Sequence, residues 1–409
     1  MRELLSLRKT QFLLLGNILS HMGSGIALIA VPWLLVKHPN GEQIFGYATM
    51  ATALITMLML LYTGSLIDKF SRKKILVLAE VFGLLCTLVI VFAEWEQAQP
   101  AVVSLVAMLL FSSMVDSVHF PTRFAFTQEL FEPHQYQRLN SLLEIQGQIA
   151  FMVAGALGGV LVEVTTFANV MLIDAITFGL GALFFAAIPY QPVLKTLAEV
   201  KPVWQDVKEG ISFIQTYRHT TSFFVYTMLP FIAVLIGMYL VPIYVAKTLK
   251  ADALVYGWHE VIWSIGAILA GLTIPILTTR VQGRVLVIWS VLFYSMCVLA
   301  LVFNTSVVGF LVISLLMGWG NAGRRVARAT AMMESIDNRM IGRMNSTLMS
   351  FGKLLQVFLV YGFTLVIPVW GTKSAFAVLG VLLLFTCWGA WQSNKRFVSS
   401  ISTKVAAGD

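Results

Sequence analysis

The chain consists of long apolar runs separated by short polar breaks. About twelve such runs can be traced, six in each half, and most are close to 20 residues long. A helix needs about 20 apolar residues to cross a hydrocarbon core of roughly 30 Å. Only helices and closed barrels satisfy the backbone inside lipid. We therefore predict an all-α membrane protein whose twelve transmembrane helices form two six-helix bundles.

The runs group into two halves. Residues 1–189 are predicted to form the first bundle, residues 221–394 the second, and residues 395–409 a cytoplasmic tail. Residues 190–220 are less apolar and predict a linker with an amphipathic helix lying on the membrane surface. The apolar positions of that helix are Trp204, Val207, Ile211 and Ile214.

Charge is unevenly distributed between the polar breaks. Of 409 residues only 12% are charged and 58% are hydrophobic, which excludes an ordinary soluble protein. The net charge is +8, yet of the 28 Lys and Arg only four fall in the outer loops: Lys37, Lys247, Lys250 and Lys373. This is the positive-inside bias of membrane proteins. It predicts a multi-pass protein of the cell inner membrane with both termini cytoplasmic, and it needs no nucleic-acid partner to explain it.

The sequence contains no pattern for a cofactor or a reaction. The three cysteines, Cys86, Cys297 and Cys387, lie far apart inside apolar runs, so no disulfide or metal pattern is present. There is no G-x-x-x-x-G-K-S/T stretch for ATP phosphates and no H-E-x-x-H. We predict no cofactor, no metal and no enzymatic activity, and a chain that acts as a monomer.

One polar break is unusually dense in charge. Residues 64–74 read Gly-Ser-Leu-Ile-Asp-Lys-Phe-Ser-Arg-Lys-Lys, with one acid and four bases. The stretch resembles the loop 2-3 signature of the major facilitator superfamily, G-x-L-x-D-R/K-x-x-R-K/R-K/R, with Ser71 where the family usually has glycine. The resemblance implies two bundles that alternate in access around a central cavity.

The same resemblance implies a gate at this loop. The implied gating residues are Gly64, Asp68, Arg72 and Lys73. Gly64 would let neighbouring backbones approach, and Asp68 would anchor the second helix to the start of the eleventh near residues 342–346. A solvated loop carboxylate is the alternative for Asp68.

Other stretches resemble the branch that includes macrolide exporters, drug:proton antiporters and related siderophore exporters. They are His119-Phe-Pro121, Leu139-Asn-Ser141, Leu172 to Phe178, Val207 to Gly210, and Gly342-Arg343. The position aligned with the family's arginine in helix 4 holds Ser112, and the position of its helix 5 proline holds Gly155. The resemblance implies export of a small organic solute, driven by protons.

Positive charges inside the predicted spans indicate the nature of the solute. Arg324 and Arg328 share one face of the tenth predicted helix, and Lys353 lies about ten residues into the eleventh. Because charge is costly inside a bilayer, such residues are expected to face a cavity. The predicted substrate-binding residues are Arg324, Arg328, Lys353, Arg123, His21 and Gln356. The alternatives are arginines that reach the interface as anchors, and a hydrogen bond between His21 and Asn17.

Acids inside the spans are candidates for proton coupling. On the fourth predicted helix, Asp116, His119 and Arg123 recur at spacings of three and four and form one polar stripe. Asp116 is the first candidate, because burial raises the pKa of a carboxylate and so sets the pH at which it takes up a proton. A salt bridge with Arg123 is the alternative. The predicted proton-coupling residues are Asp116, Asp174 and Glu260. A structural contact is the alternative for Asp174, and solvent exposure for Glu260.

These observations predict a secondary active, proton-coupled exporter in a bacterial inner membrane. The favoured solute is an anionic metabolite such as a carboxylate siderophore. A multidrug or macrolide efflux antiporter is the alternative, since 18 Met and 12% aromatic residues can supply an adaptable apolar lining. A lysophospholipid flippase of similar fold is the alternative of another class.

Overall fold

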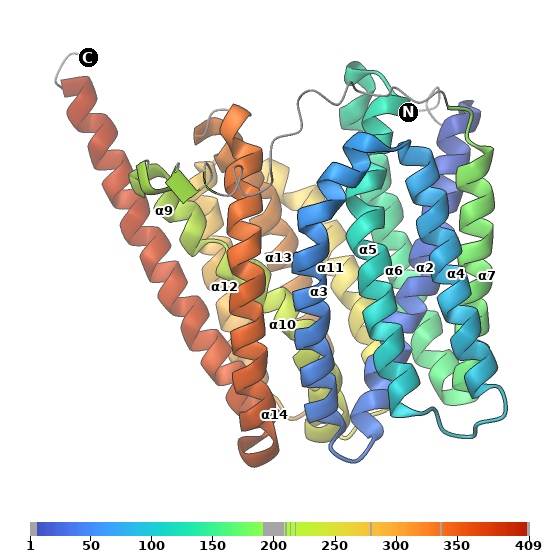
Figure 1. The fold of residues 1–409 in the computed structure, drawn as a ribbon. Helices are drawn as coiled ribbons and strands as arrows, with labels where there is room; N and C mark the ends of the chain where they lie inside the picture. The colour runs from blue at the N-terminus through green and yellow to red at the C-terminus, as the bar shows by residue number, and fades with distance from the viewer. Residues whose placement is uncertain are drawn as a thin grey trace. The chain divides into compact units, whose positions relative to one another are not determined.

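The computed structural model describes residues 6–190, 208, 211–212, 214–216, 218–278, 280–335 and 338–406. Helices make up nearly all of this part of the chain, and no strand occurs in it (Figure 1). The helices are α2 (Arg8–Lys37), α3 (Gly41–Lys69), α4 (Arg72–Glu94), α5 (Val102–Leu130), η1 (Pro133–Gln135), α6 (Tyr136–Val164), α7 (Phe167–Ala187), α9 (Arg218–Tyr226), α10 (Leu229–Ile243), η3 (Tyr244–Thr248), α11 (Ala253–Thr278), α12 (Gly283–Phe303), α13 (Val307–Ser335) and α14 (Asn338–Ala406).

The last helix is long enough to cross a membrane twice. Eleven candidate spans are found among the described residues, and the last of them, Thr347–Lys395, has 49 residues. At 1.5 Å per residue such a helix is about 74 Å long, more than twice the thickness of a hydrocarbon core. Gly371 interrupts it with a φ of 75°, and the two arms of α14 meet at a sharp turn (Figure 1). Counting both arms confirms the predicted twelve crossings.

The chain divides into two compact units. Unit 1 comprises residues 1–200 and 245–264, and unit 2 comprises residues 201–244 and 265–409. This division differs from the predicted boundary because the end of the seventh crossing and the start of the eighth contact the first bundle. Within unit 1, the backbone N–H of Ala253 donates to Glu163 Oε1 at 3.1 Å.

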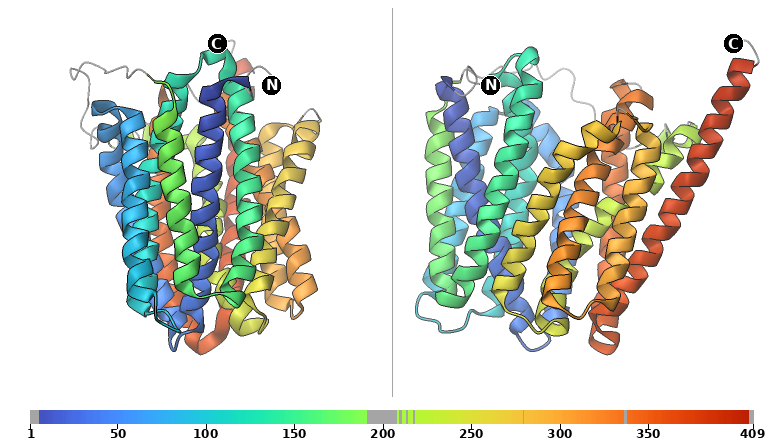
Figure 2. Two further views of the ribbon diagram at one scale, coloured as in Figure 1. Left: turned by 90° about the vertical axis from the view of Figure 1, so that its right-hand side faces the viewer. Right: turned by 180° about the vertical axis from the view of Figure 1, so that it is seen from behind.

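Unit 1 is built around α2 and α4. Helix α2 packs against α6 and α7, helix α4 packs against α5 and α7, and α3 packs against α5. The left view of Figure 2 shows α7, α2 and α6 side by side. Apolar side chains from five helices fill the end near residues 64–74: Leu13, Leu76, Phe126, Leu130, Phe131, Leu139, Phe185 and Ile188. Such close packing holds membrane helices together and fixes the helix ends that carry polar groups.

In unit 2, α12 packs against α13 and α14, and both α9 and α10 pack against α14. The seventh crossing, predicted as one helix over residues 221–246, is divided into α9, α10 and the π-helical turn η3. Pro230 in the first turn of α10 explains the first break, because proline lacks the N–H that a continuing helix needs. The predicted amphipathic helix of the linker lies mostly outside the described residues. The predicted tail is helical as far as Ala406.

Candidate functional site

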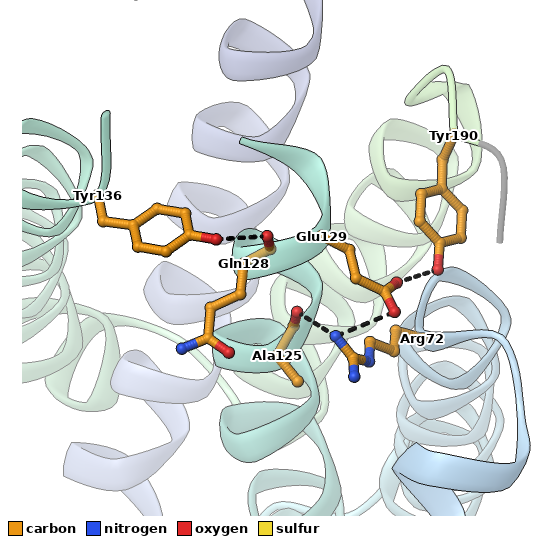
Figure 3. Close-up of polar contacts among 6 residues, drawn as sticks. All are labelled: Arg72, Ala125, Gln128, Glu129, Tyr136 and Tyr190. Atoms are coloured by element: carbon orange, nitrogen blue, oxygen red, sulfur yellow. Dashed lines mark hydrogen bonds and ion pairs between the residues drawn. The ribbon is translucent and has the colours of Figure 1, made fainter. Parts of the chain in front are cut away.

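The signature loop joins three helix ends of unit 1. Arg72, the first residue of α4, forms an ion pair with Glu129 of α5, with 3.1 Å between nitrogen and oxygen. The same nitrogen, Nη1, donates to the carbonyl oxygen of Ala125 at 2.7 Å. Tyr190, just after α7, donates its hydroxyl hydrogen to the carboxylate of Glu129 (Figure 3). Burial and this hydrogen bond raise the pKa of Tyr190, so the phenol stays protonated and remains a donor.

Lysines at the same end of unit 1 bind the last carbonyls of helices. Lys73 Nζ donates to the carbonyl oxygen of Ile188 at 2.7 Å, at the end of α7. Lys9 Nζ donates to the carbonyl oxygen of Leu130 at 2.6 Å, at the end of α5. These carbonyls have no partner within their own helix and form the negative end of its dipole. The bases of the loop therefore stabilise helix ends.

The other two predicted gating residues lie in the last turns of α3. Gly64 is exposed, and no atom of the described residues lies within 4 Å of the position that a Cβ would take there. The close approach expected at Gly64 is therefore not seen in the part of the chain that the structure describes. The side chain of Asp68 is outside the described part, so its anchor to residues 342–346 stays a prediction.

The three polar residues of the predicted stripe on α5 differ in how deeply they are buried. At about 100° per residue, Arg123 is rotated by about 20° from Asp116, whereas His119 is rotated by about 60°. Asp116 is exposed and Arg123 half-buried, but His119 is buried inside unit 1. The described ion pairs of α5 join Glu129 and His119 to α4, and none joins Asp116 to Arg123. The salt bridge that is the alternative role for Asp116 is not among the described ion pairs.

Arg123 and His21, both predicted to bind substrate, are brought together. Nη1 of Arg123 contacts Nε2 of His21 on α2. The Arg123 guanidinium also lies 5.4 Å from the ring centroid of the exposed Phe120. Asn17 is fully buried, and its amide has no hydrogen-bond partner among the described residues. The alternative pairing of His21 with Asn17 is thus not formed.

A buried acid and a buried histidine lie behind this face of α5. Glu80 of α4 is 0% exposed, and its Oε1 lies 2.9 Å from Nε2 of His119. Asp174 of α7, a predicted proton-coupling residue, is 1% exposed, and neither of its carboxylate oxygens has a hydrogen-bond partner among the described residues. Sequence patterns did not single out Glu80. The available signal was an acid in the middle of an apolar run.

Glu260, the third predicted proton-coupling residue, lies on α11. It is half-buried, and its Oε1 is 3.9 Å from Nε2 of His259. Here α11 is pressed against α6, because a Cβ added to Gly257 would lie 2.4 Å from the carbonyl oxygen of Gly155. Small residues of this kind allow membrane helices to approach closely. Gly155, where the family has proline, therefore serves helix packing.

In unit 2, α13 carries two arginines on one face. Arg324 is 4% exposed; its Nη2 donates to Asn321 Oδ1 at 2.9 Å, and its Nε has no hydrogen-bond partner among the described residues. Arg328 is half-buried, and its Nε donates to Thr227 Oγ1 at 3.4 Å. No ion pair with an acid is found for either arginine among the described side chains. The two charges are therefore held in unit 2 without compensation from the described acids.

A third arginine, which sequence reasoning missed, lies near Arg328. The guanidinium of Arg284, on the first turn of α12, is 5.3 Å from the ring of Phe223 and 5.7 Å from that of Phe224. Arg328 lies 5.9 Å from the Phe224 ring. Aromatic faces attract guanidinium groups. Arg284 lies in a basic loop that occupies the same position in the second half of the chain as residues 64–74 occupy in the first. That position was the available signal.

The remaining predicted substrate residues lie on α14. Lys353 is half-buried, and Gln356 is buried with its carbonyl oxygen lacking a hydrogen-bond partner among the described residues. No hydrogen bond or ion pair joins Lys353 to the α13 arginines among the described side chains. Unit 2 thus has an arginine group on α12 and α13 and a separate lysine on α14.

Comparisons with known proteins agree with this architecture. The sequence model of the Major Facilitator Superfamily matches residues 13–240 and 222–407. The multidrug efflux pump Tap of Mycobacterium tuberculosis is 23% identical over 212 residues, which is 50% of this chain and 51% of Tap. The match thus spans about half of that relative's length.

Two further proteins match along most of the chain. The staphyloferrin A transporter of Staphylococcus aureus is 17% identical over 377 residues, 91% of this chain and 93% of that protein. The crystal structure of the nucleoside transporter NupG has a TM-score of 0.71 at 14% identity and covers 95% of this chain and 99% of its own. At this identity the structural match supports the fold alone.

Proposed function

The chain belongs to the Major Facilitator Superfamily, and from this premise we propose that it is a proton-coupled exporter of a small anionic solute across a bacterial inner membrane. It is a membrane transporter and not an enzyme. We assign its energy to the proton gradient and not to ATP, since the sequence has no G-x-x-x-x-G-K-S/T stretch.

The arginine pair of α13 is the main reason for proposing an anionic substrate. Arg324 is nearly fully buried, and neither Arg324 nor Arg328 has an acid partner among the described side chains. A buried charge without a partner is costly, so a site of this kind is completed by a ligand of opposite charge. Arginine also matches a carboxylate in shape, because its planar fork can donate two parallel hydrogen bonds. A carboxylate siderophore is the sharpest choice, and the relative that matches 91% of the chain is named for staphyloferrin A.

The orientation follows from charge and the number of crossings. Twelve crossings leave both termini on one side, and the bases of residues 69–74 assign that side to the cytoplasm. Arg123 and His21 are the proposed substrate-binding residues of unit 1, and Lys353 is a further one of unit 2. Asp116 is the entry point for protons, because it is exposed on the same face of α5 as Arg123.

The substrate class is tested with inside-out vesicles in which a pH gradient, acidic inside, drives uptake. We expect uptake of staphyloferrin A, and we expect Arg324→Gln and Arg328→Gln to reduce it at least tenfold while uptake of the cationic dye ethidium is unchanged. The loss of one charged hydrogen bond, about 1.5–3 kcal/mol, corresponds to roughly a tenfold to hundredfold change. Arg325→Gln is the matched control, because Arg325 is exposed on the same helix. Equal loss of both probes in Arg324→Gln would contradict an anion site.

A second candidate is efflux of amphiphilic drugs. A groove of about 470 Å³ on unit 1 is lined almost wholly by apolar side chains of α3, α4 and α5, including Met59, Phe82 and Met114. Flexible and aromatic side chains of this kind accommodate varied apolar molecules. The relative Tap is named a multidrug efflux pump. Ethidium uptake without staphyloferrin A uptake in the same vesicles would favour this candidate.

A further inference from the structure

The buried pair of Glu80 and His119 lies where three helices of unit 1 meet. Glu80 comes from α4 and His119 from α5, and the Asp174 carboxylate comes from α7, against which α4 packs. Glu80 is 0% exposed, His119 5% and Asp174 1%. Glu80 Oε1 and His119 Nε2 lie at an ion-pair distance of 2.9 Å, and neither atom makes a hydrogen bond of conventional geometry in the described part of the chain.

The pair has no further ion-pair or hydrogen-bond partner among the described residues. The only ion pair of Glu80 there is the one with His119. Neither carboxylate oxygen of Glu80 or of Asp174 has a conventional hydrogen-bond partner in the described part of the chain. An ionised carboxylate in such surroundings is strongly disfavoured. A bound proton would remove that charge.

The helices approach the two carboxylates too closely to admit a hydrated ion. A Cβ added to Gly181 of α7 would lie 2.7 Å from Glu80 Oε2. A Cβ added to Gly23 of α2 would lie 2.5 Å from Asp174 Oδ1. On its other side, the His119 ring packs at 5.5 Å, edge to face, against Phe185. A proton is the one cation small enough for this site.

Charged and titratable groups link the pair to the exposed face of α5. Those facing it are Asp116 and Arg123 from α5, Asp174 from α7, and His21 from α2, with Glu144 of α6 beyond Arg123. Helix α3 also packs against α5, but its charged residues, Glu42, Asp68 and Lys69, lie only near its ends. Asp116 interacts electrostatically with both Glu80 and His119 and is itself exposed. It is the exposed acid of α5, the helix that also carries His119.

We propose that Glu80 and His119 form one proton-binding site in the core of unit 1, which holds a single proton and releases it through Asp116 during transport. With the proton, carboxylate and imidazole together are neutral. When it leaves for Asp116, a negative Glu80 and a neutral His119 remain, and Arg123, one turn from His119 on α5, is the nearest positive charge on that helix. The inference rests on the proton coupling of the proposed function and assigns the coupling proton to this pair.

Infrared pH-difference spectroscopy of the purified protein in liposomes tests the site without any substrate. We expect the wild type to show a carboxylic-acid band that appears as the pH falls and that is absent in Glu80→Gln. In His119→Gln the carboxyl of Glu80 loses the imidazole with which it holds the proton, so its band should titrate at a different pH from that of the wild type. Glu96→Gln, in the exposed loop after α4, should leave the band unchanged. A spectrum of Glu80→Gln that matches the wild type, or a His119→Gln band that titrates normally, would overturn the proposal.

Transport in proteoliposomes then separates coupling from substrate binding. For Glu80→Gln we expect uptake of staphyloferrin A driven by a pH gradient to fall at least tenfold, while exchange of the same molecule at equal pH is retained. Gradient-driven uptake at the wild-type rate would refute the assignment. Monodisperse elution establishes that a variant is folded, and His119→Gln serves as the second variant. If the wild type responds to no gradient with staphyloferrin A or ethidium, the proposed function fails, whereas the infrared titration still decides the proton site.

Discussion

Arg72 shows what one side chain contributes at the end of unit 1. Its Nη1 carries two hydrogens, and these serve both Glu129 Oε1 and the carbonyl oxygen of Ala125. The side chains of Arg72 and Glu129 are only 11% and 13% exposed, so water screens the pair little. Arg72 of the signature loop therefore joins the start of α4 to the last turns of α5, and it is also a predicted part of the gate.

We expect Tyr190→Phe to lower the thermal stability of the detergent-purified protein at pH 7 by roughly 1.5–3 kcal/mol, the contribution of a hydrogen bond to a charged group. The raised pKa of Tyr190 means that this contribution is complete below the unfolded pKa of about 10 and is lost as the pH rises through the higher folded value. The stability difference should thus be constant from about pH 6 to pH 9.

The control for this prediction is Tyr136→Phe. Tyr136 donates to the carbonyl oxygen of Gln128 at 2.8 Å at the same end of unit 1, but its partner is uncharged and its hydrogen bond is exposed (Figure 3). It should cost about 1 kcal/mol or less. Equal melting temperatures for Tyr190→Phe and the wild type would show that the bond to Glu129 adds nothing.

At the scale of elements, glycines decide which helices come together. The contact between α6 and α11 is made by Gly155, Gly159 and Gly257, where one backbone faces another. A Cβ on Gly159 would lie 2.9 Å from the carbonyl oxygen of Ala253. Because the opposing atoms are backbone, they cannot rotate away. This contact brings residues 253–264 into unit 1.

We expect Gly257→Leu to separate α6 from α11 and to destabilise the protein by at least about 1–3 kcal/mol, the usual cost of overpacking. Thermal unfolding followed by size-exclusion chromatography measures the effect. Gly271→Leu, on the same helix, is the matched control, because no atom lies within 4 Å of its Cβ position among the described residues. Comparable destabilisation by both variants would argue against the close helix contact.

At the scale of the whole molecule, the number of crossings sets the topology. The two arms of α14 are counted as two spans, which makes the total even. An even number leaves both termini on one face, and the proposed orientation, which follows the positive-inside rule, places that face in the cytoplasm. The loop between α4 and α5 then lies outside, and the turn between α5 and α6 lies inside.

This topology predicts how introduced cysteines are labelled in intact cells. With Cys86, Cys297 and Cys387 replaced by serine, Gln97→Cys should react with a membrane-impermeant maleimide, because residue 97 is exposed in the loop after α4. His134→Cys, exposed in η1, should react only after the cells are permeabilised. The reverse order of labelling would invert the proposed orientation and the direction of export with it.

The fold and the charged residues of the signature loop could be read from the sequence because each depends on local chemistry. Lipid leaves the backbone no partner outside its own helix, so about 20 apolar residues are enough to predict a span. The helix order, the twelve crossings and the basic end of α4 all follow from such runs. The sequence also indicated two polar groups: Arg324 and Arg328 on one face of a helix, and Asp116, His119 and Arg123 in a stripe on another.

Only the tertiary structure decided which polar groups meet. Whether His119 faces outward with Asp116 or inward with Glu80 depends on how α5 is rotated against α4, and that rotation is set by packing across the whole bundle. The same holds for Arg284 with Phe223 and for His21 with Arg123, which come from helices far apart in the sequence. Apolar runs are local properties of the chain. Pairings between helices are not, because they depend on side chains that no single run contains.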